Sequence, residues 1–372
     1  MWQAEVRVDL DAIRENVTRL RASTTAELMA VVKADGYGHG MVPVARAALD
    51  AGADWLGVCT LDEALTLRRA GIAAPVLAWL LVPGLPLHDG IEAGIDLGAG
   101  SVGLLGELVA AAERVGRPAR VHLKVDTGLS RGGATPQDWP ALVEAAAKAQ
   151  SDGTVEVVGI WSHLVYADAP THPTIDRQIS VFREAVEVAE RHGVRPRYRH
   201  LANSAATLTR PDTHFDLVRP GIAIYGLTPI PGRDFGLRAA MTARARVMLT
   251  KRVPAGTGVS YGHTYYTERE TTLAVVPVGY ADGIPRHASN VAPVQIGGRI
   301  RRIAGRVCMD QVVIDCGDDP VAPGDVVVFF GSGRNGEPTA DDWAAALNTI
   351  NYEIVTRFGG IRVARVYDGA GA

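Results

Sequence analysis

Between residues 10 and about 230, short apolar runs alternate with longer segments in which apolar residues recur every three to four positions. The short runs predict strands and the longer segments predict helices, because side chains share a face every 2 residues in a strand and every 3.6 in a helix. Strands that alternate with helices are typical of parallel βα units. This alternation constrains the possible fold more than any other feature of the chain.

Eight of the short runs qualify as strands: Leu28–Val32, Trp55–Val58, Val76–Trp79, Ile95–Leu97, Val121–Val125, Val155–Trp161, Tyr198–Leu201 and Phe215–Val218. Eight strands over about 220 residues favour a closed (β/α)8 barrel over an open doubly wound sheet. The segment DLDAIRENVTRLRAS predicts the first helix, with Asp9 or Asp11 as its N-cap.

After about residue 237 the sequence pattern changes to apolar runs rich in β-branched residues, which are broken by Gly, Pro and Asp. It predicts a mainly antiparallel β domain. We therefore expect an α/β barrel over residues 10–236 and an all-β domain over residues 237–372, to which residues 1–9 contribute a strand. One helix is expected within the β domain, over TADDWAAALNTINYEIVTRF, with Thr339 and Asp342 placed for a capping box.

Composition excludes several classes of protein. The net charge of -3 gives no reason to expect nucleic acid or an anionic membrane as a partner. Three cysteines form neither a disulfide framework nor a metal-ligand pattern, so no metal is expected. The N-terminal segment lacks the apolar stretch of a signal peptide, and the longest uncharged run, residues 72–87, is interrupted by prolines. We expect a cytoplasmic protein.

Polar side chains follow five of the predicted strands, where a (β/α)8 barrel carries its chemistry. They are Lys33 and Tyr37 after the first strand, Lys124, Asp126 and Arg131 after the fifth, His163 and Asp168 after the sixth, Asn203 and Ser204 after the seventh, and Arg219 after the eighth. Each of them alone is compatible with a solvated loop. Together they predict an active site at this end of the barrel.

The residue types suggest the ligand. Ser204 and the backbone amides of Gly221 and Ile222 follow the last two strands, where many barrels bind phosphate. Lys33 is an amine on the opposite wall, and Arg219 is a cation between the two. A lysine, a cation and a phosphate site together suggest pyridoxal 5'-phosphate, with Lys33 forming the Schiff base and Arg219 facing the pyridine nitrogen.

Seven motifs carry a resemblance to a known family: AVVKADGYGHG, HLKVDTGLSRGG, HLANSAA, LVRPGIAIYG, SYGHTY, VGYADGIPR and GRVCMDQ. In their order and spacing they resemble the alanine racemases, fold-type III pyridoxal-phosphate enzymes in which a barrel precedes a β domain. The resemblance implies a homodimer that interconverts L-alanine and D-alanine and supplies D-alanine for bacterial peptidoglycan.

The resemblance also implies roles for individual residues. Lys33 and Tyr261 would be the two catalytic bases, with Tyr261 reaching into the partner's barrel. The resemblance matches further residues with the cofactor: Tyr37, Ser204, Gly221, Ile222 and Tyr352 with its phosphate, Asn203 with the cofactor as a whole, and Arg219 with its pyridine nitrogen, with His163 between Arg219 and Tyr261. For the substrate, it matches Arg131 and the Met309 backbone with the carboxylate, Lys124 as a carbamate that orients Arg131, and Asp310 as a residue nearby. It places Asp168, Tyr280, Arg286 and Arg306 along an access corridor.

Several alternatives stay open at this point. Lys124 can simply pair with Asp126, Tyr261 can be an ordinary β-domain aromatic, and the corridor residues can be plain interface residues. A racemase that also accepts serine differs only in pocket size. A fold-type III amino-acid decarboxylase resembles this plan but has an acidic residue in the position of Arg219 and a reactive cysteine in the β domain. A non-catalytic pyridoxal-phosphate carrier resembles the barrel alone.

Overall fold

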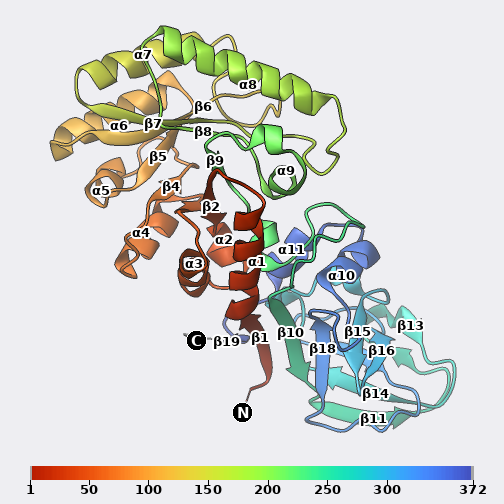
Figure 1. Ribbon diagram of the computed structural model, residues 1–372. Helices are drawn as coiled ribbons and strands as arrows, with labels where there is room; N and C mark the ends of the chain where they lie inside the picture. Colours follow the sequence, from red (N-terminus) through yellow and green to blue (C-terminus); the bar gives the residue numbers. More distant parts are fainter. Residues whose placement is uncertain (1, 370–372) are drawn as a thin grey trace.

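The computed structural model describes residues 2–369. Figure 1 shows a barrel of strands surrounded by helices, and beside it a smaller domain built mainly of strands. The strands nearest the two ends of the described chain, β1 (Ala4–Asp9) and β19 (Ala364–Asp368), lie side by side in the smaller domain.

The barrel strands are β2 (Glu27–Val31), β3 (Trp55–Val58), β4 (Val76–Ala78), β5 (Asp96–Ala99), β6 (Ala119–Lys124), β7 (Val155–Trp161), β8 (Tyr198–His200) and β9 (Leu217–Val218). Neighbours pair in parallel in the order β8-β7-β6-β5-β4-β3-β2-β9. Backbone hydrogen bonds from Asp216 N to Arg199 O (3.0 Å) and from Arg219 N to Ala202 O (2.9 Å) bring the two ends of this sheet together. The predicted barrel is therefore confirmed.

The helices that cover the barrel are α1 (Leu10–Ala22), α3 (Met41–Asp50), α4 (Leu61–Arg69), α5 (Leu87–Glu92), α6 (Val102–Val115), α7 (Trp139–Ser151), α8 (Thr174–Arg191) and α9 (Ser204–Thr209). α1 shows why they form where they do. Asp9 caps it by accepting a hydrogen bond from Ala12 N at 2.9 Å. Its apolar stripe, which includes Ile13, Val17 and Leu20, is fully buried, and each such side chain contributes roughly 1.5–3 kcal/mol.

The smaller domain contains three sheets, and the order of the largest is β16-β15-β18-β10-β1-β19. The strands of this largest sheet are β1 (Ala4–Asp9), β10 (Met241–Arg246), β15 (Pro293–Ile296), β16 (Arg299–Arg302), β18 (Val326–Phe330) and β19 (Ala364–Asp368). The second sheet contains β11 (Leu249–Val253), β14 (Thr271–Val276) and β17 (Val312–Asp315), and the third contains β12 (Gly258–Val259) and β13 (Tyr265–Tyr266). β1 lies between β10 and β19, antiparallel to the first and parallel to the second. The first residues of the chain thus belong to the sheet of the C-terminal domain.

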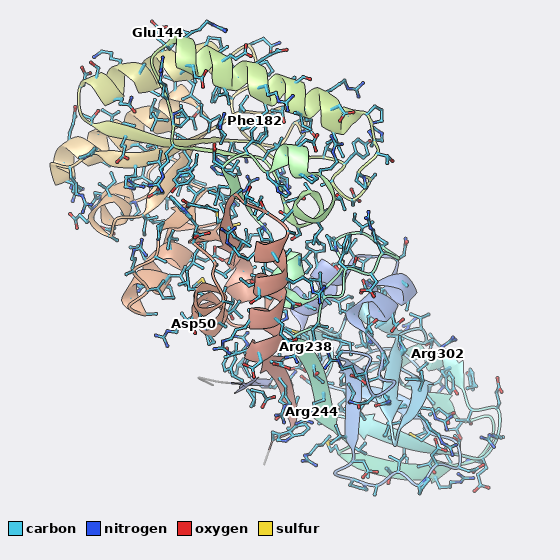
Figure 2. The ribbon with its side chains drawn as sticks, viewed as in Figure 1. Asp50, Glu144, Phe182, Arg238, Arg244 and Arg302 are labelled. Atoms are coloured by element: carbon cyan, nitrogen blue, oxygen red, sulfur yellow. The ribbon has the colours of Figure 1, made fainter. Side chains whose placement is uncertain are left out.

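Ion pairs join the two domains where β1 passes directly into α1. Arg238 bonds Asp9 at 2.7 Å and lies 3.2 Å from Glu15 on α1. Within the sheet of the smaller domain, Arg244 on β10 pairs with the buried carboxylate of Glu5 on the neighbouring β1. Figure 2 shows Arg238 at the boundary and Arg244 on β10. The junction is thereby held by side chains from both domains.

The helix expected near the C-terminus is in fact two helices, α10 (Ala340–Leu347) and α11 (Asn351–Arg357), so the prediction of one continuous helix was wrong. Asn348 ends α10 in the left-handed conformation (φ 52°), which asparagine tolerates better than most residues. The predicted capping box at the start of α10 is confirmed, because Thr339 and Asp342 exchange hydrogen bonds.

Short helical turns complete the chain: α2 (Lys33–Tyr37), η1 (Pro211–Thr213), η2 (Ile222–Tyr225), η3 (Tyr261–His263), η4 (Tyr280–Asp282) and η5 (Arg286–Ala288). Within residues 2–369, no helix combines the length and the apolar character that crossing a membrane requires.

Candidate active site

A cavity of about 730 Å³ opens at the carboxyl ends of the barrel strands. Eleven of the residues singled out in the sequence line it: Lys33, Tyr37, Lys124, Arg131, His163, Asn203, Ser204, Arg219, Gly221, Ile222 and Tyr352. All but Tyr352, which lies on α11, follow or end barrel strands. Residues that are far apart in the sequence therefore meet in one pocket.

Lys33 begins a turn of unusual backbone geometry. Ala34, Asp35, Gly36 and Tyr37 are all left-handed, with φ between 50° and 62°. Such a conformation costs roughly 1–2 kcal/mol for each residue that is not glycine. Of these four residues, only Gly36 adopts the left-handed conformation without this cost. A short strained turn at the mouth of the barrel fixes the direction in which the lysine leaves the strand.

The C-terminal domain holds this turn in place. Asp35 accepts hydrogen bonds from Met41 N (2.8 Å) and from Arg365 on β19 (2.6 Å). A methyl group added at Gly40 would lie 2.0 Å from the Tyr367 hydroxyl oxygen. Because both contacts come from β19, the last strand of the chain supports the turn that carries Lys33.

Arg219 is a buried cation without a carboxylate partner among the described residues. Its Nη2 donates to the carbonyl oxygens of Ser162 (2.7 Å) and Leu201 (3.3 Å), and its Nη1 donates to His200 Nδ1 (3.1 Å). Within residues 2–369, its Nε has no hydrogen-bond partner. Burial lowers the pKa of Arg219 to about 9, so the guanidinium is still charged at pH 7.

Opposite Lys33 the wall of the pocket is made of small groups. The Ser204 hydroxyl accepts hydrogen bonds from Gly221 N (2.8 Å) and Ala223 N (3.3 Å). A Cβ at Gly221 would lie 2.3 Å from the hydroxyl oxygen of Tyr37, so only glycine fits beneath that ring. Hydroxyl and amide groups thus converge on one spot without a bulky side chain between them.

The pocket carries an excess of positive charge. Lys33, Lys124, Arg131 and Arg219 line it, and among the described lining residues the single carboxylate is that of Glu353, which pairs with Arg357 at 3.0 Å. Burial, with the charges of Arg219 and Arg131, lowers the pKa of Lys124 to about 8. Burial and the same arginines hold the pKa of His163 well below its usual value. An anionic ligand would relieve this repulsion.

Lys124 does not make the ion pair with Asp126 that was left open. Its ammonium group lies over the Trp161 ring, 4.4 Å from the centroid, while one carboxylate oxygen of Asp126 accepts three backbone N–H groups of its own loop. Its lowered pKa leaves a larger fraction of neutral amine than a free lysine has.

The structure does not bring the remaining predicted residues into the pocket of their own chain. Asp168 lines a neighbouring cavity of about 850 Å³ that shares Asn203 and Tyr352 with the pocket. The others lie on the C-terminal domain and are exposed: Tyr261, Tyr280, Arg286, Arg306, Met309 and Asp310. Tyr261 is 70% exposed, and neighbouring β13 lies on the side of that domain away from the barrel. Asp310 is engaged in an ion pair with Arg362.

The lining residues that sequence reasoning missed include Cys59, Trp79 and Trp161. Lys33 Nζ lies 5.9 Å from the centroid of the Trp79 ring. Trp161 faces the cations Lys124 and Arg219. A signal was available, because all three residues end or follow predicted strands, but apolar side chains there were assigned to the core.

Two family profiles cover nearly the whole chain. "Alanine racemase, N-terminal domain" matches residues 8–229, and "Alanine racemase, C-terminal domain" matches residues 240–367. The chain belongs to the alanine racemase family. An alanine racemase of Salinispora arenicola is 76% identical over 369 residues, covering 99% of both chains, and one of Frankia casuarinae is 61% identical, covering 97% of this chain and 95% of that one.

Solved alanine racemases have the same fold. The structure of the enzyme from Streptomyces lavendulae is 55% identical and covers 100% of this chain and 98% of its own, with a TM-score of 0.98. The structure of the alanine racemase from Clostridium difficile is 31% identical and covers 100% of this chain and 97% of its own, with a TM-score of 0.93. These comparisons confirm the family, the fold and the isomerase class that the seven motifs predicted.

Proposed function

We propose that the protein interconverts L-alanine and D-alanine with pyridoxal 5'-phosphate as its cofactor. The observation that carries this proposal is the barrel-mouth pocket, in which Lys33 and the buried, carboxylate-free Arg219 lie in one cavity of about 730 Å³. D-alanine made in this way supplies peptidoglycan. The fold, the free cysteines and the absence of a spanning helix within residues 2–369 are compatible with a cytoplasmic location.

The pocket fits the cofactor. Lys33 supplies the amine for a Schiff base, and Ser204, Gly221, Ile222, Tyr37 and Tyr352 surround the place of the phosphate. Asn203 lies in the same wall. Arg219, whose Nε has no hydrogen-bond partner within residues 2–369, would hold the pyridine nitrogen, and because arginine stays protonated it would favour the unprotonated form of that nitrogen. Bound pyridoxal phosphate supplies the conjugated system that stabilises negative charge at the substrate Cα.

Racemisation needs a proton removed from one face of Cα and another delivered to the opposite face, so two bases must stand on opposite sides. Lys33 serves one face. Tyr261 serves the other, but its exposure places it outside the pocket of its own chain. We therefore infer a homodimer in which each pocket receives Tyr261 from a second copy. His163 would lie between Arg219 and that tyrosine and link the two.

The remaining charged groups bind and guide the substrate. Arg131 and the backbone of Met309 from the second copy hold the carboxylate of alanine, with Asp310 nearby. The lowered pKa of Lys124 favours its neutral amine, which would add carbon dioxide and release a proton to give a carbamate that turns Arg131 toward the substrate. Asp168, Tyr280, Arg286 and Arg306 line the access corridor between the two chains.

The first test is incubation with L-alanine and pyridoxal phosphate, followed by chiral chromatography. D-alanine should accumulate to an equal mixture while total alanine stays constant. Unchanged alanine would contradict the proposal. A parallel reaction with L-serine measures substrate breadth. Serine differs from alanine by one hydroxyl, and a pocket discriminates against such a group by roughly 1–3 kcal/mol.

Mixing two inactive variants tests the shared site. A dimer of one Lys33→Ala chain and one Tyr261→Phe chain contains one pocket with both intact bases. Activity should therefore return when the two variants are unfolded and refolded together, and it should stay absent when each is refolded alone. No recovery in heterodimers isolated with two different affinity tags would contradict the shared site.

A further inference from the structure

A chain of hydrogen bonds runs through the barrel interior from the pocket toward the opposite end of the strands. Arg219 Nη1 lies 3.1 Å from His200 Nδ1, His200 Nε2 lies 2.9 Å from His122 Nδ1, and His122 Nε2 lies 3.1 Å from Asp96 Oδ2. All four side chains are buried. The pocket cation is thus connected to a carboxylate that does not line the pocket.

The two ends of the chain determine the direction of its hydrogen bonds. Arginine can only donate and an ionised carboxylate can only accept, while a neutral imidazole donates from one nitrogen and accepts at the other. With neutral rings, every contact is satisfied in one arrangement alone: both His122 and His200 carry their proton on Nε2. A protonated His122 would donate from both nitrogens and would turn His200 so that an N–H faced Arg219.

The charges agree with this arrangement. Burial and the positive charge of Arg219 hold the pKa of His200 well below its usual value, so its ring is neutral. Burial acts to raise the pKa of Asp96, but the hydrogen bonds from His122 and Arg120 and the positive charge of Arg120 leave the pKa below its usual value. Asp96 therefore remains an acceptor at the far end.

The packing of the barrel leaves both rings little freedom. A Cβ at Gly159 on β7 would lie 2.3 Å from His122 Nδ1, so glycine is required beside the atom that contacts His200. The Trp161 ring is stacked on His200, with centroids 5.7 Å apart and planes 1° apart. Trp55 and His122 pack edge to face, with ring centroids 5.6 Å apart.

We propose that Asp96 and His122 are positioning residues for Arg219. They act through the chain of hydrogen bonds from Asp96 through His122 to His200, which we call the relay. The relay fixes both imidazoles as neutral rings protonated on Nε2, so that His200 Nδ1 is an acceptor for the guanidinium of Arg219. Arg219 is 5% exposed and has no carboxylate partner within residues 2–369. The acceptor on His200 holds Nη1 while the carbonyls hold Nη2, which leaves Nε available to a ligand in the pocket. This role rests on the proposed function, in which Arg219 faces the pyridine nitrogen.

The direct test is the protonation pattern of the two rings in the full-length protein with pyridoxal phosphate bound. Nitrogen-15 NMR of histidine-labelled protein distinguishes a protonated ring nitrogen from an unprotonated one, and His122→Gln and His200→Gln variants assign the signals. Both rings should carry the proton on Nε2. A proton on Nδ1 of His200 in the wild-type protein would overturn the proposal without recourse to any measurement of activity.

Asp96→Asn tests the consequence, with Glu156→Gln as its matched control. Both carboxylates bond Arg120, but Glu156 does so outside the barrel and touches neither imidazole. In Asp96→Asn the oxygen stays on Arg120 Nε, the closer donor at 2.8 Å, and the amide N–H then faces His122. Both rings should invert, and kcat should fall about 10-fold or more, since the lost bond is to a charged group, with a smaller change in KM.

The absorption band of the bound cofactor should shift in Asp96→Asn and stay in place in Glu156→Gln. Identical ring protonation, spectrum and kcat in the two variants would overturn the proposal. Failure of the wild-type protein to racemise alanine would instead contradict the proposed function, because the relay measured by NMR does not depend on turnover.

Discussion

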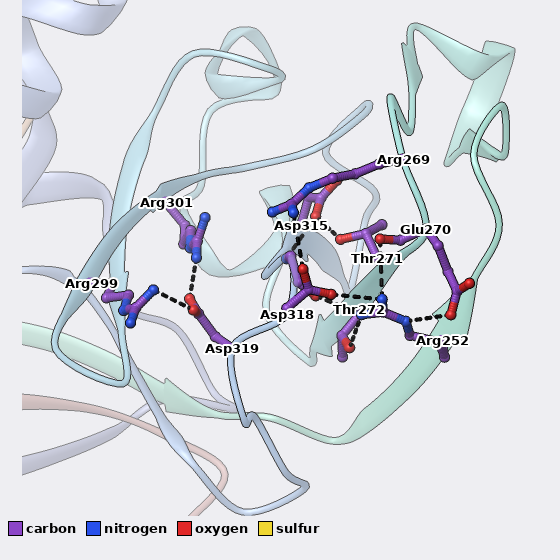
Figure 3. A network of polar contacts seen from close by, with 11 residues as sticks. Arg252, Arg269, Glu270, Thr271, Thr272, Arg299, Arg301, Asp315, Asp318 and Asp319 are labelled. Carbon is purple, nitrogen blue, oxygen red and sulfur yellow. Dashed lines mark hydrogen bonds and ion pairs between the residues drawn. The ribbon is translucent and has the colours of Figure 1, made fainter.

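Arginine side chains occur in two very different settings in this molecule. In the C-terminal domain, Arg252 bonds Glu270 (2.9 Å) and Asp318 (2.6 Å), and Arg269 bonds the same Asp318 at 2.9 Å. Figure 3 shows this exposed network, together with the pairs that Arg299 and Arg301 make with Asp319. Arg219 in the barrel has carbonyls and an imidazole as partners, and no carboxylate among the described residues.

The difference separates groups that stabilise the fold from groups kept for a ligand. A surface network is solvated, screened and close to neutral in total, so losing one member changes little. Four cations around one cavity repel each other and lose hydration, which costs stability until an anion binds. The molecule therefore keeps its uncompensated positive charge where a phosphate and a carboxylate are expected.

The strongest test of this contrast is Lys33→Ala. Because Lys33 has no ion pair among the described residues, its removal should leave the unfolding temperature of the protein without cofactor unchanged or slightly higher. Formation of D-alanine should nevertheless fall by about 10⁴-fold or more, since a catalytic base and the covalent attachment are both lost. Chiral chromatography and a thermal melt measure the two effects. A clear loss of stability would assign Lys33 to the fold instead.

Tyr261→Phe tests whether an exposed residue of the C-terminal domain belongs functionally to the pocket. Loss of the hydroxyl should reduce kcat by roughly 10²–10⁴-fold without destabilising the chain. Tyr266→Phe is the matched control, because Tyr266 is an exposed tyrosine (58%) only five positions away. Equal racemisation rates in the two variants would contradict the role of Tyr261.

Acidification should affect the barrel mouth through His39. Burial lowers the pKa of His39 to about 4, despite its contacts to the carbonyls of Tyr37 and Gly36. The unfolded chain takes up this proton below about pH 6.5 and the folded chain does not, so stability falls as pH drops from 6.5 toward 4, by up to about 3 kcal/mol. Denaturant unfolding at several pH values measures this dependence.

His39→Gln should flatten that pH dependence, because glutamine has no proton to gain. His287→Gln is the control, since its ring is exposed to water in the folded protein. An unchanged pH dependence in His39→Gln would show that other groups cause the acid sensitivity.

The smallest effect is expected for Arg252→Ala. Arg252 is exposed and shares its carboxylates with other groups, so racemisation should be unchanged and the unfolding temperature should fall only slightly. High salt should remove even this difference, because salt screens exposed pairs. A large loss of stability that persists in 1 M salt would remove the distinction between the two settings of arginine.

The sequence predicted the barrel well because buried parallel strands are short apolar runs that stand out between helices. Most predicted strand limits lie within one or two residues of those observed. The break at Asn348 was missed because its neighbours continue a helical pattern, and only the backbone angle of one residue interrupts it. The left-handed turn after Lys33 could not be predicted, because Ala34, Asp35 and Tyr37 adopt φ > 0 although none of them is glycine.

The pocket residues were predictable because a barrel sends the ends of all its strands to one face. The relay beneath them was not. His122 and Lys124 are two positions apart on β6, which places both on its inner face, but the partners Asp96 and His200 are 26 and 78 positions from His122. Strand alternation indicates that these side chains point inward, and only the closed barrel determines which of them touch.

The position of β1 between β10 and β19 has a consequence for biosynthesis. The barrel is an insertion between the first and second strands of one sheet, and that sheet gains β19 only from residues 364–368. Arg365 and Tyr367, which brace the turn at Lys33, follow the whole barrel in the sequence. A nascent chain can therefore complete its barrel before the brace for its lysine has been synthesised.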